Sequence, residues 1–209
     1  MFLRTLTNTL VIGVTAAVGA MVVSVAASWI ITRTRSKVRW LVDVLAFLPH
    51  VLPAVSTALA ILIVYLILPI PVYGTIWIIV IAMITKYISL GTRNTTTGLL
   101  QLHPRLEEAA AMSGASGVQV WRRVLTPLLR PALISGGLLI FLGSVRNLTL
   151  PLVLQTSDNS VLSVLIWDKW AGSAGDPAGT AVLGMVTTVI TIIVTVALRI
   201  FEERGGADR

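Results

Sequence analysis

Residues that could catalyse a reaction or bind a metal are scarce in this sequence. It contains no cysteine, which excludes disulfides, thiolate metal sites and cysteine nucleophiles. The two histidines, His50 and His103, are far apart in the chain, and neither belongs to an HExxH pattern. The phosphate-binding patterns GxxxxGKS and GxxxxGKT are also absent, so the chain cannot bind ATP with such a loop. The sequence therefore argues against intrinsic catalysis and predicts no metal or cofactor of its own.

Three polar residues in apolar surroundings are candidates for a solute path. His50 lies between Pro49 and Pro53, where lost backbone hydrogen bonds leave carbonyl groups free, and a histidine inside a membrane is a functional candidate. Alternatively, His50 lies near a helix end and faces neighbouring polar groups. Arg146 and Asn147 interrupt a later apolar segment, and Arg146 should border a cavity or a partner because exposure to lipid costs about 2.5–3.5 kcal/mol. Snorkelling of Arg146 to the outer interface is the competing interpretation.

Two further charged residues lie near predicted membrane boundaries. Asp43 follows a basic linker by a few residues, and we predict that it pairs with Arg39 at the interface rather than carrying protons. Lys86 lies near the end of a predicted helix, from which its long side chain can reach the interface.

The overall composition makes these polar residues conspicuous. Of the 209 residues, 56% are hydrophobic and 12% are charged, and the mean hydropathy is +0.90. Soluble domains have about 25% charged residues, and disordered chains combine low hydrophobicity with high net charge. The chain is therefore predicted to be a membrane protein. Its net charge of +7 is expected to reflect basic residues held on one membrane face rather than nucleic-acid binding.

Charge-free segments locate the membrane spans, because about 20 helical residues cross a hydrocarbon core of roughly 30 Å. The uncharged run from 44 to 85 is about twice that length and must turn back, which the sequence Pro69-Ile70-Pro71-Val72-Tyr73-Gly74 allows. The predicted fold is all-α, a polytopic membrane protein that forms one domain over residues 1–209. Its five expected transmembrane helices cover about 6–32, 41–68, 75–90, 131–150 and 178–198.

The distribution of basic residues sets the expected orientation. All but three of the sixteen lysines and arginines fall after the first span, from the end of the third span (where Lys86 lies) to the start of the fourth, or at the C-terminus; the exceptions are Arg4, Arg146 and Lys169. These three basic segments are expected to be cytoplasmic and the N-terminus external. The external segment 158–177 either holds a short surface helix that could meet a partner or is a plain loop.

The segment 91–130, between the third and fourth spans, begins with the signals of a short helix. Pro104 fits a first helical position. Glu107 and Glu108 lie near the positive end of the helix dipole, and Gly114 ends the helix.

A second short helix is predicted after that glycine. Ser116-Gly117-Val118-Gln119 fits a capping box, and the helix is expected to end near Pro127. Val118, Trp121 and Leu125 form an apolar stripe on it, which is expected to pack on the bundle or on a partner.

These loop residues carry a resemblance to a known family. Glu108-Ala109-Ala110, then Gly114, then Val124-Leu125-Thr126-Pro127 resembles the EAA loop of the membrane subunits of binding-protein-dependent ABC importers. Over its whole length the chain resembles this permease domain, and the sequence around the loop is similar to permeases of the ferric-iron type. Thr126 stands where the family usually has leucine. Iron-type permeases commonly carry two such halves, whereas this chain has one, so it either pairs with another copy or is part of a longer protein, such as its C-terminal half.

The resemblance implies a subunit of an ATP-driven importer in the inner membrane. A separate cytoplasmic ATPase, which binds ATP and magnesium, would receive the loop as a coupling helix. A second permease domain, an extracytoplasmic substrate-binding protein and the lipid bilayer are the other expected partners, and no nucleic acid is expected. The residues expected to carry coupling are Glu107, Glu108, Ala109, Ala110, Gly114, Val124 and Pro127. Small alanines allow close approach, Glu108 can make charge-assisted contacts, and Gly114 permits a bend.

Ferric iron is the substrate that the resemblance favours. Thiamine, sulfate, polyamine and phosphonate importers use related permeases, so these substrates stay open, as do homodimer and heterodimer pairing. An ion-coupled secondary carrier is the alternative from another class, but it would need inverted repeats and acidic residues inside the membrane. Asp43 is the only acidic residue near a span, and five helices do not divide into equal halves.

Overall fold

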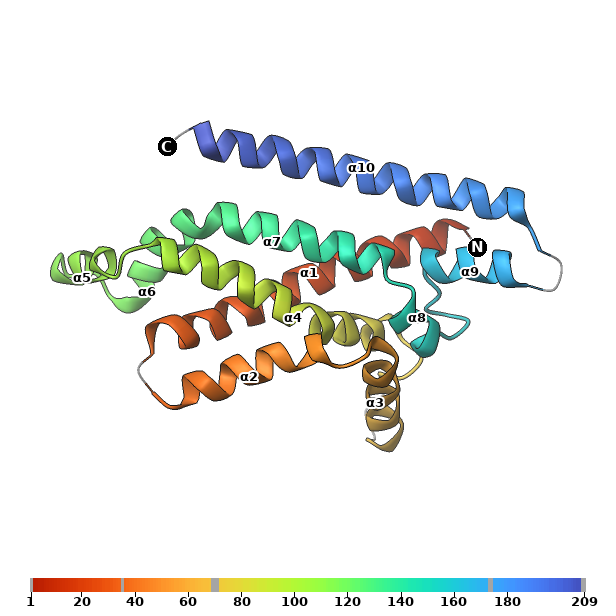
Figure 1. Cartoon of the computed structure of the whole chain (residues 1–209), viewed down its shortest axis with the longest axis horizontal. Helices are drawn as coiled ribbons and strands as arrows, with labels where there is room; N and C mark the ends of the chain where they lie inside the picture. The colour runs from red at the N-terminus through yellow and green to blue at the C-terminus, as the bar shows by residue number, and fades with distance from the viewer. Residues whose placement is uncertain (1, 35, 69–71, 173–174, 208–209) are drawn as a thin grey trace.

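Helices form every regular element in the part of the chain that the computed structural model describes, residues 2–34, 36–68, 72–172 and 175–207 (Figure 1). This confirms the all-α prediction. In chain order the elements are α1 (Phe2–Arg33), α2 (Val38–Val51), α3 (Ala54–Ile67), α4 (Ile76–Gln101), α5 (Arg105–Met112), α6 (Gly117–Val120), the π-helical turn η1 (Trp121–Leu125), α7 (Thr126–Arg146), α8 (Thr149–Leu154), α9 (Leu162–Ala171) and α10 (Pro177–Ala207).

The long helices α1, α4 and α7 pack against one another and form the centre of the molecule (Figure 1). Small residues such as Ala20 and Ser24 are fully buried in this contact and let the helix backbones approach closely. Two serines of α1 use this proximity. Ser24 Oγ donates to the Ile88 carbonyl at 3.2 Å, and Ser28 Oγ donates to the Thr92 carbonyl at 2.9 Å.

Gly91 marks a close approach of α4 to α1, because an added β-carbon would collide with Ser24 Oγ and lie 3.3 Å from Ile140 Cδ1. We expect Gly91→Val to lower the free energy of unfolding by about 1–3 kcal/mol, the usual cost of overpacking a core. Gly184→Val on α10 is the control, since nothing lies within 4 Å of a β-carbon there. Thermal unfolding in detergent, followed by tryptophan fluorescence, measures the difference. Equal unfolding temperatures for the two variants would contradict this packing of α1 on α4.

Among the described residues, four helical segments are long and apolar enough to cross a membrane: α1, α4, Gly117–Arg146 and Pro177–Ala197. The bent pair α2 and α3 makes a fifth span if it is counted as one. The segments follow the order of the five predicted spans.

The segment 41–68, predicted as one helix, is divided into α2 and α3, which are bent by 109° at Leu52 and Pro53. Pro53 has no N–H and restricts the residue before it, and Leu52 accordingly has extended φ and ψ of −74° and 137°. Pro49, by contrast, is accommodated inside α2. α3 therefore turns away from α2 and packs against α8 (Figure 1). The first residues of the predicted turn, 69–71, lie outside the described residues.

Three other predicted boundaries are wrong. α4 continues to Gln101, well beyond residue 90, because the added part contains no proline and packs on α1 and α7. α7 begins at Thr126 rather than at 131 and ends at Arg146 rather than at 150. Pro127 lies in the first turn of α7, directly after η1, and the helix runs without a break from Gly117 to Arg146. The second short loop helix therefore does not end there but continues through η1 into α7.

The end of the molecule opposite α5 and α6 is built by α8, α9 and the start of α10 (Figure 1). α9 shows that the short-helix interpretation of segment 158–177 is the correct one. Asp176 precedes α10 and accepts hydrogen bonds from Lys169 Nζ and the Gly179 amide, both at 2.8 Å, which hold the pKa of Asp176 below its usual value. α10 packs on α7 and α9. Only 6% of the most apolar 18-residue stretch of Pro177–Ala197 is buried, so most of the surface of α10 is free for lipid or a partner.

Candidate functional site

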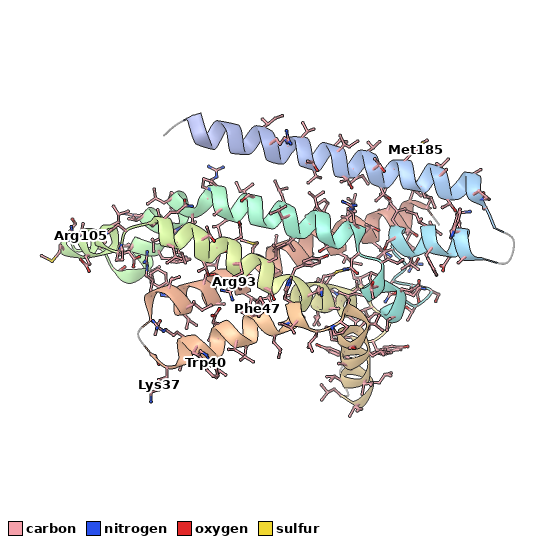
Figure 2. All side chains as sticks on the ribbon, viewed as in Figure 1. Lys37, Trp40, Phe47, Arg93, Arg105 and Met185 are labelled. Atoms are coloured by element: carbon pink, nitrogen blue, oxygen red, sulfur yellow. The ribbon has the colours of Figure 1, made fainter. Side chains whose placement is uncertain are left out.

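α5, a helix of eight residues, projects at one end of the molecule (Figure 1). Its two faces differ in exposure. Arg105, Glu108, Ala109 and Met112 share the outward face and are exposed, Met112 by 90%. Figure 2 shows Arg105 at the outer tip of the helix. This face, called here the outward face of α5, combines a cation, an anion, a small residue and a large apolar side chain.

The opposite face of α5 is held by an ion pair. Arg33 Nε lies 2.7 Å from Glu107 Oε1, and the two side chains are only 12% and 19% exposed. Arg33 Nη2 also donates to the carbonyls of Leu102 at 3.0 Å and Leu99 at 3.3 Å. One guanidinium group therefore ties the first turn of α5 to the ends of α1 and α4.

An apolar cluster lies beneath α5 and α6. Trp29 of α1 meets Trp121 of η1 edge to face, with 5.0 Å between ring centroids, a favourable arrangement for aromatic rings. Both rings and Ala110 pack on the buried residues of the cluster, which are Leu99, Val120, Leu125 and Leu129. Val118, expected on the same stripe as Leu125, is 76% exposed, because η1 intervenes between α6 and α7. The cluster joins α5 and α6 to α1, α4 and α7.

The turn between α5 and α6 has the predicted geometry. Gly114 has a φ of +81°, which favours glycine, and no atom lies within 4 Å of a β-carbon built there. Ser116 Oγ accepts from the Gln119 amide at 3.4 Å, and Gln119 Oε1 accepts from the Ser116 amide at 2.8 Å. The predicted bend and capping box are confirmed.

The remaining loop positions lie in the passage from α6 to α7. Val124 is half-buried in η1, and Pro127 is exposed at the start of α7. The Trp121 carbonyl accepts from both the amide and the hydroxyl of Thr126, the latter at 3.0 Å. The threonine at this position thus supplies a hydrogen bond that leucine could not make.

The candidate path residues lie on different elements. His50 is exposed on α2, with its ring centroid 5.6 Å from that of Phe47. Arg146 is exposed and is the last residue of α7, so it ends the span rather than interrupting it. Asn147 follows it, and its Oδ1 accepts from the Leu150 amide at 3.1 Å, which stabilises the start of α8. Their roles in solute movement stay predictions.

Two charged residues lie elsewhere than expected. Asp43 pairs with Arg93 of α4, Oδ1 to Nη2 at 3.2 Å, so the predicted pairing with Arg39 is wrong. The cause is the continuation of α4 past residue 90, which carries Arg93 alongside α2. Lys86 lies ten residues after the start of α4 and fifteen before its end, so the predicted end-of-helix position is also wrong.

Sequence reasoning did not identify the role of Arg33. The available signal was Glu107, which lies off the helix face that Arg105, Glu108 and Met112 share. If its side of the helix is covered, its carboxylate needs a partner. Nothing local distinguishes Arg33 from the other basic residues of its linker, so only the tertiary fold, which brings the end of α1 to the start of α5, selects it.

Comparison with known proteins places this geometry in a family. Residues 10–205 match the family described as binding-protein-dependent transport system inner membrane component. The chain belongs to this family. It is therefore an integral membrane permease subunit, and ATP hydrolysis in such transporters belongs to a separate subunit.

Curated relatives differ in the solute that their names give. The Fe(3+)-transport system permease protein FbpB 2 of Haemophilus influenzae is 25% identical over 167 residues, which cover 80% of this chain and 33% of that protein. The putative 2-aminoethylphosphonate transport system permease protein PhnV of Salmonella paratyphi A is 29% identical over 168 residues, which cover 80% of this chain and 62% of that protein. The chain spans less than two thirds of the length of either relative.

Solved structures share the fold. A chain of the MetNI methionine ABC transporter in an inward-facing conformation aligns with a TM-score of 0.77 and 16% identity, covering 96% of this chain and 94% of that one. A chain of a bacterial alginate ABC transporter, in complex with an alginate pentasaccharide-bound periplasmic protein, also has a TM-score of 0.77, with 18% identity and coverage of 97% and 78%. The fold is that of ABC transporter permeases.

Proposed function

We propose that this permease moves a solute inward across the inner membrane, driven by ATP hydrolysis in a separate subunit that binds α5. The observation that carries the proposal is the outward face of α5, exposed on a helix whose inner face is fixed by Arg33 and Glu107. A helix that is rigidly joined to the spans can both fit a cleft of the ATPase and transmit its closure. Ala109 allows close approach of the cleft wall, while Glu108 and Arg105 supply charge-assisted contacts at its rim.

The proposed orientation places α5 and α6 in the cytoplasm. Arg33 and Lys37 lie at the same end of the bundle as Arg105 and Arg122, which agrees with the excess of basic residues on the cytoplasmic side of membrane proteins. The C-terminal end of α10 lies at this end too, and the N-terminus lies at the other (Figure 1). The substrate-binding protein then docks at the end that carries α8 and α9.

A second permease domain completes the path in this proposal. It is either another copy of this chain or a related half, and the two domains enclose the solute between them. Two solutes have specific support. Ferric iron is the solute named for one relative, and 2-aminoethylphosphonate is named for another that shares slightly more identity and more of its length. In the described ranges no three His, Asp or Glu side chains gather to hold a metal ion, so iron would pass without a resident metal site.

Ala109→Trp tests the docking of α5. The exposed alanine can accept the larger side chain without disturbing the inner face, so the spans should stay folded while the ATPase no longer fits. Co-purification with the ATPase, and ATP hydrolysis in liposomes stimulated by the substrate-binding protein, should both fall at least about tenfold, the loss expected when about 1.4 kcal/mol of binding is removed. Val182→Trp, an equal enlargement at an exposed position of α10, is the control. Full stimulation of the Ala109→Trp assembly would refute the docking of α5.

A further inference from the structure

One face of α4 carries two cations at membrane depth. Lys86, Leu90, Arg93 and Thr97 follow each other at intervals of four, three and four residues and so lie on the same side of the helix. Lys86 is half-buried, and the other three are exposed. Across the described part of the chain, Lys86 has no hydrogen bond or ion pair. This side of α4 is called the basic face.

α2 lies beside the basic face and runs antiparallel to α4. Asp43 pairs with Arg93 at 3.2 Å, and Ser89 Oγ donates to the Ala46 carbonyl at 2.6 Å. Later residues of α2 therefore lie beside earlier residues of α4. One further turn along this register brings His50 to the depth of Lys86. His50 and Lys86 therefore lie at the same height along the two helix axes, called here a level. Asp43 and Arg93 lie at a second level, nearer α5.

Phe47 separates the two levels. Its ring lies 5.3 Å from the Arg93 guanidinium carbon and 5.6 Å from the His50 ring. Figure 2 shows Phe47 and Arg93 in the space between α2 and α4. Arg93 is thus held by an acid and by an aromatic face, a favourable site for a guanidinium group, whereas Lys86 has neither.

The depth of Lys86 determines what can face it. With α4 beginning at Ile76 and ending at Gln101, Lys86 lies about 15 Å from one end and about 22 Å from the other, inside a hydrocarbon core of roughly 30 Å. A cation at that depth is costly against lipid and borders either a water-filled path or protein. Among the described parts of α1 to α4 and of α7, Asp43 is the one acidic residue, and Arg93 already neutralises it. The basic face therefore has an excess of positive charge.

We propose that Lys86, at the level of His50, is an anion-binding step on the solute path of this permease. The inference rests on the proposed import function and names its substrate class. The solute carries an anionic oxygen group, either the phosphonate of a molecule such as 2-aminoethylphosphonate or the carboxylates of an anionic ferric chelate. A bare ferric cation would be repelled at this level. An anion that passes Lys86 next meets Arg93, where it competes with Asp43 for the guanidinium group.

The absence of cysteine from these 209 residues makes this proposal directly testable, because a single introduced thiol is unique among them. Leu90→Cys places the thiol on the basic face, one helical turn from Lys86. The assembled transporter is labelled with anionic 2-sulfonatoethyl and with cationic 2-trimethylammonioethyl methanethiosulfonate, in the nucleotide-free and ATP-bound states. Each labelling rate is divided by the rate at which the same reagent reacts with 2-mercaptoethanol. This division corrects for the different intrinsic reactivities of the two reagents.

We expect the anionic reagent to be favoured about tenfold, the ratio that one nearby positive charge gives between reagents of opposite charge in water. Lys86→Met in the Leu90→Cys background should bring the ratio to about one, and Lys86→Arg should keep it, since the charge alone is needed. Val18→Cys, on an exposed apolar part of α1, is the control and should show no dependence on Lys86. Competition by 2-aminoethylphosphonate or by ferric citrate identifies which anion slows the labelling.

Three results would overturn the proposal: equal or cationic preference at Leu90→Cys, a preference that survives Lys86→Met, or no labelling in either nucleotide state. Stimulated ATP hydrolysis is measured on the same preparations. If hydrolysis is stimulated and the charge preference is absent, this inference fails while the proposed function stands. If the preference is present without any stimulation, the proposed coupling to an ATPase fails instead.

Discussion

Gly114→Val is expected to abolish stimulated ATP hydrolysis by the assembled transporter while leaving the membrane spans folded. The φ of +81° at this position costs a residue with a β-carbon about 1–2 kcal/mol, and a β-branched residue is among the least tolerant of it. Because no atom lies within 4 Å of an added β-carbon, the variant relieves the strain by rotating the backbone rather than by repacking. That rotation changes the direction of α5 relative to α6 and moves the outward face of α5 away from its partner.

The measurement is ATP hydrolysis in liposomes with and without the substrate-binding protein, together with co-purification of the ATPase. We expect a reduction of at least about tenfold, since losing about 1.4 kcal/mol from a binding interface has this effect. Two controls separate backbone strain from bulk. Gly114→Asn should retain much of the stimulation because asparagine adopts positive φ more readily. Gly117→Val adds the same bulk three residues away, also in open space but without a positive φ, and should remain active. Normal stimulation by Gly114→Val would mean that the bend is unnecessary for coupling.

Glu107→Leu is expected to loosen α5 from the bundle. Removing one partner of a buried ion pair usually costs about 3–5 kcal/mol, because the other charge is left uncompensated. Arg33 is 12% exposed and keeps its two carbonyl partners on α4, so we expect a loss near the lower limit, about 3 kcal/mol. The consequence is local opening of α5, since the ion pair joins its first turn to α1 and α4.

Tryptic cleavage after Arg105 measures this opening, and thermal unfolding measures the global effect. Cleavage of Glu107→Leu should be at least about tenfold faster, because each 1.4 kcal/mol raises the open population tenfold. The double variant Arg33→Met with Glu107→Leu should recover most of the stability, because two apolar groups can replace a buried ion pair. Asp158→Leu removes a pair with Arg4 whose side chains are 64% and 73% exposed, and this control should change little. If Glu107→Leu behaves like that control, the ion pair does not fix α5.

Local signals in the sequence were sufficient for the turn that exposes α5. Gly114 and the pair Ser116 and Gln119 act within one helical turn, so residue type and spacing alone predicted the bend and the cap that the structure contains. Chain composition likewise fixed the membrane class, because 12% charged residues cannot cover the surface of a soluble domain of this length.

Helix boundaries were harder to predict, because a proline breaks a helix in one place and lies within a helix in another. Pro53 breaks the helix between α2 and α3, whereas Pro49, Pro127 and Pro131 lie inside helices. No pattern within a single segment distinguishes these two settings. The charge-free criterion also ended α4 too early, because Arg93 is tolerated within the helix once Asp43 faces it.

The sequence by itself determined the all-α membrane fold, the order of the spans and the loop that carries the family resemblance, because these follow from hydrophobic run length and from contacts within a few residues. Only the tertiary structure decided that Glu107 turns inward to Arg33 while Glu108 turns outward, and that Lys86 and His50 share one level between α2 and α4. These arrangements join residues that are far apart in the chain, and each depends on the register with which two helices pack. That register is set by side chains along the whole contact, such as the small residues between α1 and α4, and not by the residues that it brings together.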